Sequence, residues 1–173
     1  MAIAIDATVG GATANSFALL TDATTYMAGR LNSAAWDNAT VDQQNRALVE
    51  ATHELSYLSW EGRRATSTQA LSWPRWMAQN PDSPVGFLYL STVVPDRVLN
   101  ATCELAFQFL VAGTTDIAAL DPTLGVIHKE TGPIKKSYQP YQKPTGLARF
   151  PSVMRFIRPL LASTANSTPI LRG

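Results

Sequence analysis

One helix-forming stretch, residues 95–113, constrains the fold of this chain more than any other feature. Pro95 suits the first position of a helix, where its missing N–H is harmless, and Gly113 is placed to end the helix. On a helical projection the polar side chains form one narrow stripe: Arg97, Asn100, Glu104 and Gln108. The remaining surface is apolar: Val98, Leu99, Leu105, Ala106, Phe109 and Leu110. Such a helix is buried by its neighbours, so we predict the central helix of a small bundle.

Other segments agree with a mainly α fold. Thr40 and Gln43 have the spacing of a capping box. The apolar positions that follow predict one seam of a second helix: Val41, Leu48, Ala51, Leu55 and Leu58. An earlier helix should begin at Thr21 or Asp22 and run to about Leu31. Residues 15–20 favour a strand, 116–120 a short helix or turn, 126–129 a strand-like stretch and 151–161 a last short helix.

The segment between the second and third helices, residues 60–94, contains too many helix breakers for a long helix. They are Gly62, Pro74, Pro81, Pro84 and Gly86, which favour an extended loop or hairpin. Three tryptophans and three arginines are interleaved there: Trp60, Arg63, Arg64, Trp73, Arg75 and Trp76. This composition suits a stacking platform for single-stranded nucleic acid. Alternatively, and this we favour, the tryptophans pin the loop to the bundle, while the arginines pair with carboxylates of the same or a neighbouring subunit.

Charge is divided along the chain. Residues 1–120 have a formal charge of −5 and residues 121–173 a charge of +6. The basic part is rich in proline, so we do not expect it to close a core of its own. Its basic and apolar residues suit a segment that becomes ordered on a partner with acidic or phosphate groups. We therefore expect three regions: a flexible or partner-ordered arm at 1–14, a helical-bundle core at 15–120 and a C-terminal docking arm at 121–173.

The residues that chemistry would need are few. The single cysteine, Cys103, excludes an internal disulfide, and its apolar helix face favours a buried side chain. His53 lies opposite the apolar seam of its helix, as a solvated histidine would, and His128 has no second His or Cys nearby. There is no nucleophile elbow and no phosphate-binding loop motif. We expect no enzyme activity, no metal, no cofactor and no membrane segment.

The order of several motifs carries a family resemblance. W-x-G-R-R at 60–64 is followed by A-L-x-W-P-R at 70–75 and V-P-x-x-V at 94–98, and the chain closes on Ile170-Leu-Arg-Gly173. Over residues 15–173 this resembles the head-completion adaptors of tailed bacteriophages. These are head-to-tail connector subunits, sometimes labelled DnaT-like single-stranded-DNA-binding proteins.

The resemblance implies a virion protein of the head–tail neck, assembled in the bacterial cytoplasm. It implies a ring of twelve copies that binds the portal protein and a downstream neck, stopper or tail-terminator protein, with double-stranded genomic DNA passing through without sequence readout. The tryptophans and arginines of the loop would lie at bundle or subunit interfaces. The portal-docking residues would be Lys135, Lys136, Tyr138, Tyr141, Lys143, Arg149, Phe150, Arg155, Phe156, Ile157, Leu160, Leu161, Ile170, Leu171 and Arg172.

A second hypothesis is a replication accessory protein that binds single-stranded DNA. In that case Trp60, Trp73 and Trp76 would stack on bases while the arginines of the same loop bind phosphates. Residues 79–94 and 137–149 depart from the pattern of the phage adaptor family, and we expect contacts particular to this protein there.

Overall fold

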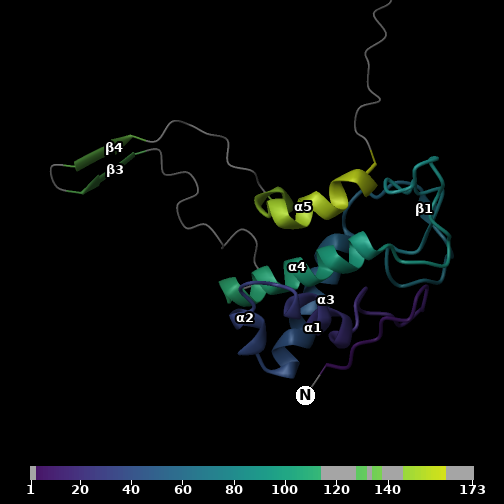
Figure 1. Ribbon diagram of the computed structural model, residues 1–173, viewed down its shortest axis with the longest axis horizontal. Coiled ribbons are helices and arrows are strands. Elements are labelled where there is room, and N and C mark those ends of the chain that lie inside the picture. Colours follow the sequence, from purple (N-terminus) through teal and green to yellow (C-terminus); the bar gives the residue numbers. More distant parts are fainter. Residues whose placement is uncertain (1–2, 114–127, 132–133, 138–145, 163–173) are drawn as a thin grey trace, which may run out of the picture.

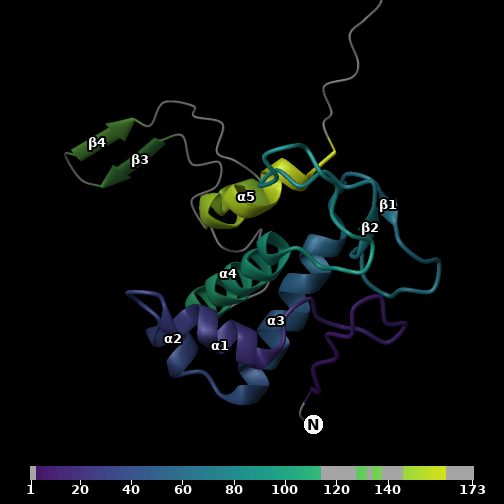
Figure 2. The same ribbon diagram turned by 45° about the vertical axis from the view of Figure 1, so that its right-hand side comes forward.

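The fold is mainly α, as predicted. The computed structural model describes residues 3–113, 128–131, 134–137 and 146–162 (Figure 1). Its α-helices are α1 (Leu20–Ala28), α2 (Ala34–Asp37), α3 (Val41–Ser56), α4 (Asp96–Ala112) and α5 (Pro151–Ile157). Figures 1 and 2 show α4 between α5 on one side and α1, α2 and α3 on the other. It packs most extensively against α3 and α5, which makes it the centre of the bundle.

The central helix α4 confirms the first prediction. Pro95 is its N-cap, and Gly113 ends it in the left-handed conformation with φ 67°. Residues on most sides of α4 are buried, among them Val98, Ala101 and Leu105. The predicted polar stripe is not uniformly solvated, because Glu104 is buried as well. Its carboxylate is compensated by groups from α1 and the residues after it.

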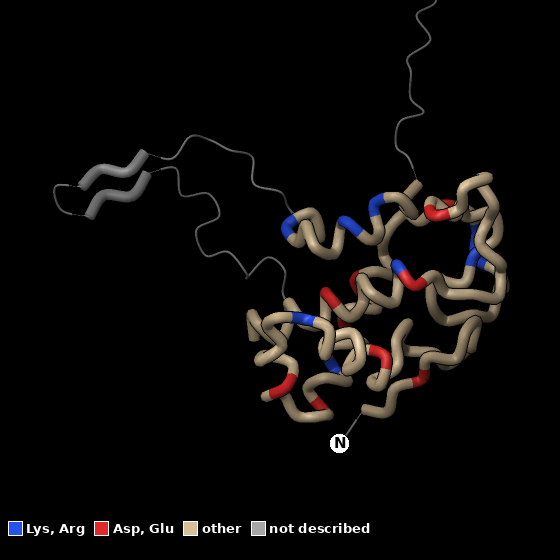
Figure 3. Tube along the Cα trace, in the orientation of Figure 1, with Lys and Arg blue, Asp and Glu red and all other residues tan. Residues whose placement is uncertain are grey.

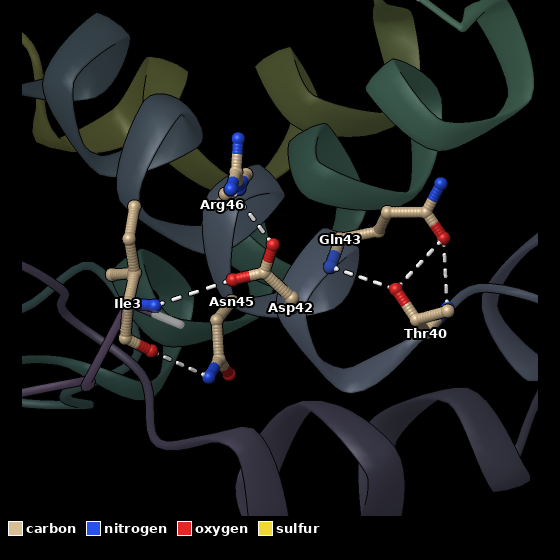
Figure 4. Close-up of polar contacts among 6 residues, drawn as sticks. All are labelled: Ile3, Thr40, Asp42, Gln43, Asn45 and Arg46. Carbon is tan, nitrogen blue, oxygen red and sulfur yellow. Dashed lines mark hydrogen bonds and ion pairs between the residues drawn. The ribbon is translucent and has the colours of Figure 1, made fainter. Parts of the chain in front are cut away.

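Helix α3 begins at the predicted capping box. The Gln43 N–H donates to Thr40 Oγ1 at 3.3 Å, and the Thr40 N–H donates to Gln43 Oε1 at 2.8 Å (Figure 4). Leu48, Ala51 and Leu55 are fully buried, as the seam predicted. Val41 was placed wrongly in that seam, since it is 60% exposed in the first turn of the helix.

The N-terminal segment lies on the bundle. We expected a flexible or partner-ordered arm, whereas residues 3–14 make contacts within their own chain. The Ile3 N–H donates to Asp42 Oδ1 at 3.2 Å, and Asn45 Nδ2 donates to the Ile3 carbonyl at 2.9 Å (Figure 4). The pKa of the Asp42 carboxyl is lowered, first by the Ile3 N–H and also by Arg46. Further along, the Asp6 N–H donates to Asn15 Oδ1 at 2.8 Å.

The first helices differ from the prediction in detail. Residues 15–20 form no strand; Ser16, Phe17 and Ala18 are buried in a bend, where the Phe17 N–H donates to Thr52 Oγ1. Helix α1 ends at Ala28 and does not reach Leu31, which is fully exposed. The short helix α2 was not predicted, and it buries Trp36. A four-residue helix has no periodicity to detect, so its tryptophan was the only available signal.

Residues 146–162 fold back on the bundle, although we expected them to belong to an arm that docks on a partner; the short helix expected at 151–161 is present. In α5 and the 3-10 turn that follows it (Arg158–Leu160), Val153, Ile157 and Leu160 are buried against the core. A short 3-10 helix (Gly146–Arg149) precedes α5 and buries Leu147. We had not expected these residues to join a core, because the prolines and basic residues around them dominate the composition.

The C-terminal region contains a pair of short strands. Strands β3 (His128–Thr131) and β4 (Ile134–Ser137) pair antiparallel, with His128 opposite Ser137 and Thr131 opposite Ile134. The strand-like stretch expected at 126–129 therefore falls, where it is described, at residues 128–131. The turn or short helix expected at 116–120 lies outside the described residues.

Candidate nucleic-acid interface

The long segment between α3 and α4 is built around a two-stranded ribbon. Strands β1 (Arg63–Arg64) and β2 (Arg75–Trp76) pair antiparallel, so that Arg63 lies opposite Trp76 and Arg64 lies opposite Arg75. Residues directly opposite share a face of a ribbon, and neighbours along a strand point to opposite faces. One face therefore carries Arg63 and Trp76, and the other carries Arg64 and Arg75.

Trp60 and Trp73 hold this segment on the bundle. Both indoles are buried, and Trp60 Nε1 donates to the Leu55 carbonyl at the end of α3 at 2.9 Å. Trp73 packs edge-on against Trp60, with ring centroids 5.7 Å apart, and against Tyr89 at 6.1 Å. The anchoring role favoured from the sequence is thus seen within one chain. Stacking of bases on these two rings, the other interpretation, is wrong because neither ring is accessible.

Trp76 differs from the other two tryptophans. It is 49% exposed, and its Nε1 donates to the Ala65 carbonyl at 3.2 Å, which fixes the ring by its edge. Arg63, opposite Trp76, is exposed as well. An exposed aromatic ring beside an exposed guanidinium is the arrangement that the sequence suggested for a stacking platform, reduced to a single tryptophan.

Two arginines of the ribbon, Arg64 and Arg75, bind backbone carbonyls. Arg64 Nη2 donates to the carbonyls of Ala70 and Leu71 at 2.7 and 3.0 Å. Arg75 Nε donates to the Glu61 carbonyl at 2.7 Å, and its Nη2 donates to the Gly62 carbonyl at 2.6 Å. The ion pairs seen among the described residues include those of Arg30, Arg46 and Arg97, and none of them involves the ribbon. The predicted pairing of Arg63, Arg64 and Arg75 is therefore not seen with the described carboxylates of the same chain, and pairing with a neighbouring subunit stays a prediction.

Among the described residues, the positive charge of the ribbon is therefore not balanced by an ion pair. Burial lowers the pKa of Arg75, and the charge of Arg64 lowers it further. Two cations held this close repel each other, and an anion would relieve that repulsion. The carbonyls fix the guanidinium groups in place, so a bound anion would not have to order them.

Further basic residues lie on α5 and in the turn after it. This turn is joined to the loop by hydrogen bonds from the Glu61 N–H to the Leu160 carbonyl at 3.0 Å and from the Ala162 N–H to the Ser59 carbonyl at 2.8 Å. Arg155 on α5 and Arg158 in the turn after it are exposed, and neither α5 nor this turn carries an acidic residue. Figure 3 shows basic residues along α5 and at the edge of the loop.

The residues expected to dock a portal protein differ in their burial and location. Ile157 and Leu160 are buried in the bundle and are not available to a partner, while Phe150, Phe156 and Leu161 pack against it partly buried. Arg155 lies 5.4 Å from the Phe156 ring centroid, and Arg149 is partly buried. Lys135 and Lys136 belong to β4. The others lie outside the described residues: Tyr138, Tyr141, Lys143, Ile170, Leu171 and Arg172.

Two other candidate residues behave as expected. Cys103 is buried, and burial raises the pKa of its thiol to about 12. His53 is exposed on α3. Among the described residues no cluster of His, Cys, Asp and Glu could hold a metal ion, and no helix has the length and apolarity to cross a membrane.

Sequence reasoning missed the exposed apolar residues of the segment that leads to α4. Gln79 and Leu88 form a β-bridge, and Phe87 and Leu90 are exposed beside it. No periodicity marks them, because the segment is irregular. The density of large apolar residues between Val85 and Val94 was the only available signal.

Comparison with known proteins gives one match. No curated protein and no solved structure matches the chain. A family model with the description "Putative DnaT-like ssDNA binding protein" matches residues 1–173, which is the whole chain. The chain therefore belongs to this family of DnaT-like proteins.

Proposed function

We propose that this protein binds single-stranded DNA through the exposed face of the β1–β2 ribbon. The observation that carries the proposal is the pairing of Arg63 with Trp76 on a loop whose arginines have no carboxylate partner among the described residues. The description of its family supports the same activity. The arginines would bind phosphates, and the exposed half of the Trp76 ring would stack on a base.

The physical chemistry gives this proposal a magnitude. Stacking of one base on an aromatic side chain contributes about 1 to 3 kcal/mol. Each phosphate neutralised on a single strand adds about 0.7 to the slope of log affinity against log salt. The recognition needs no particular base, since every base has a face to stack.

The test is fluorescence anisotropy of a labelled oligothymidine, titrated with the protein at about 50 mM salt and then at rising salt. We expect Trp76→Ala to weaken binding about 5- to 150-fold, and Arg63→Gln to lower the salt slope by about 0.7. Phe87→Ala and Arg46→Gln are matched controls, because each removes an exposed aromatic ring or an arginine that is not part of the ribbon. Absence of binding by the unmodified chain at about 50 mM salt would refute the proposal.

A second candidate function is a subunit of a phage head-to-tail connector ring. It is favoured by the apolar side chains exposed on the segment before α4: Val85, Phe87, Leu88, Leu90 and Val93. A cluster of this kind on an ordered segment suits a protein–protein contact. The ring of twelve copies, the portal protein and the virion neck remain predictions from the sequence resemblance.

Mass photometry of the chain, alone and mixed with the portal protein of the same genome, tests this second function. A portal complex with about one copy of the chain per portal subunit would favour it. If the chain stayed separate from the portal protein and bound the oligonucleotide, the connector function would be refuted and DNA binding retained.

A further inference from the structure

A cleft of about 480 Å³ opens on the other face of the ribbon. It lies between the end of α3, the N-terminal segment and the ribbon, and His53, Tyr57, Arg64, Ser72 and Arg75 are among its lining residues. Because Arg64 and Arg75 face away from Arg63 and Trp76, the cleft is distinct from the exposed stacking face. None of the described residues that line it has a carboxylate side chain.

The arginines in the cleft retain donors for a ligand. Arg64 uses Nε and Nη2 for the carbonyls of Ala70 and Leu71, which leaves Nη1 without a partner in the described structure. Arg75 Nη1 donates to the Ser72 carbonyl at 3.1 Å, and this nitrogen carries a second N–H. Two fixed guanidinium groups with spare donors can bind a phosphate, which has several acceptor oxygens and negative charge.

A buried hydroxyl supports a polar ligand at this place. Ser72 is 7% exposed and lines the cleft, yet its Oγ has no hydrogen-bond partner among the described residues. Ser56 Oγ, from the end of α3, is in the same situation. A buried polar atom without a partner is uncommon, and rotation of the Ser72 side chain toward the cleft would let a phosphate or its bound water satisfy it.

The rim of the cleft has a surface for a base. Tyr57, the C-cap residue of α3, is 85% exposed and lines the cleft together with the apolar side chains of Leu58 and Leu71. An exposed aromatic ring next to a cationic pocket matches the two parts of a nucleotide. The volume is also within the range of small-molecule sites.

We propose that this cleft binds one nucleotide unit, with its phosphate at Arg64 and Arg75 and its base against Tyr57. The proposal rests on the proposed function, because it makes the cleft a second subsite for the same strand. A DNA strand and a free nucleotide present the same phosphate chemistry, so the test includes both.

The experiment is an NMR titration of the ¹⁵N-labelled full chain with thymidine monophosphate, following the arginine Nε–Hε resonances. Thymidine, which lacks the phosphate, is the matched ligand control. We expect the monophosphate to shift the Arg64 and Arg75 resonances and thymidine to leave them unchanged. Tyr57→Ala should weaken binding of the monophosphate about fivefold or more. Leu31→Ala, an exposed apolar residue elsewhere, should not change it.

The oligonucleotide then separates this inference from the proposed function. If the oligonucleotide bound through Trp76 while Arg64 and Arg75 did not shift and Tyr57→Ala had no effect, the cleft would be refuted and DNA binding would stand. If the monophosphate shifted both arginines but no oligonucleotide bound, the cleft would be a free-nucleotide site and DNA binding would fail. Where the monophosphate does bind, Arg64→Lys, which keeps the charge but loses the planar fork, should weaken the shift of the Arg75 resonance.

Discussion

Arg30 and Glu104 form an ion pair that ties the end of α1 to the central helix. The Glu104 side chain is 4% exposed and that of Arg30 is 28% exposed, so the carboxylate is the buried partner. Tyr26 Oη donates to the same carboxylate oxygen at 3.2 Å, and the Arg30 guanidinium lies 4.4 Å from the Phe107 ring centroid. Glu104 therefore serves the packing of the bundle and is not part of a solvated stripe.

Replacement of Arg30, the more exposed partner of this ion pair, should destabilise the fold. We expect Arg30→Met to lower the free energy of unfolding by about 3 kcal/mol, because it leaves Glu104 buried with Tyr26 alone. Glu104→Leu combined with Arg30→Met should recover much of that loss, since two apolar side chains replace the pair. Urea unfolding followed by circular dichroism measures the double-mutant cycle. Additive effects of the two substitutions would show that the pair makes no coupled contribution.

The stability of the fold should fall at alkaline pH. Burial raises the pKa of Cys103 from 9.0 to about 12. Above pH 9 the unfolded chain releases the thiol proton while the folded chain keeps it, so stability decreases by about 1.4 kcal/mol per pH unit. Burial and the charge of Glu104 likewise raise the pKa of Tyr26 to about 12, which adds to the decline above pH 10.

Two variants separate these groups in urea unfolding between pH 8 and 10. Cys103→Ala should abolish most of the decline between pH 9 and 10, whatever its effect at pH 8. Tyr26→Phe should keep that decline, because the tyrosine titrates later. An unchanged slope in Cys103→Ala would mean that the thiol does not titrate with unfolding.

The sequence was sufficient for elements whose local signals agree with one another. Helix α4 has a terminating glycine and an almost continuous apolar surface, and helix α3 has its capping box and seam, so both were predicted closely. The short helix expected at 151–161 is present as α5 and the 3-10 turn after it, but the packing of residues 146–162 on the bundle was not predicted. Ile157 and Leu160 belong to the core of the same chain, and nothing in their own neighbourhood distinguishes that surface from another protein's.

The candidate site shows the same division. The sequence brought Trp60, Trp73, Trp76 and the three arginines together, but composition does not separate buried rings from exposed ones. The tertiary structure makes this distinction: Trp60 and Trp73 are buried, whereas backbone pairing places the half-exposed Trp76 opposite Arg63. Tyr57 could not have been assigned to the site from sequence, because the cleft is formed by segments distant along the chain.

Substitution of the tryptophans should separate structure from binding. Trp73→Ala removes a buried ring that contacts Trp60 and Tyr89, so we expect it to cost about 3 to 5 kcal/mol of unfolding free energy. Trp76→Ala should change stability by about 0.5 kcal/mol or less, since the ring is half exposed. Urea unfolding of both variants, beside the anisotropy titration, checks this. Equal destabilisation would mean that Trp76 is a further anchor and not a binding residue.

The geometry of the ribbon should depend on Gly62, which directly precedes β1. Gly62 has φ +71°, and a Cβ there would lie 2.1 Å from the Trp76 carbonyl oxygen. Gly86 has the same φ, but a Cβ would meet nothing within 4 Å. Gly86→Ala is therefore a matched control, which should cost about 1 to 2 kcal/mol for the left-handed backbone alone.

Gly62→Ala should cost about 3 kcal/mol or more, because the Trp76 backbone must also move. That movement shifts Trp76 relative to Arg63, so we expect the oligonucleotide affinity of the folded variant to fall as well, while Gly86→Ala keeps it. Urea unfolding gives the first quantity and fluorescence anisotropy the second. The contrary outcome is that Gly62→Ala loses stability and still binds the oligonucleotide with the same affinity as Gly86→Ala. In that case DNA binding would not depend on the position of Trp76 relative to Arg63, and the binding surface would lie outside the ribbon.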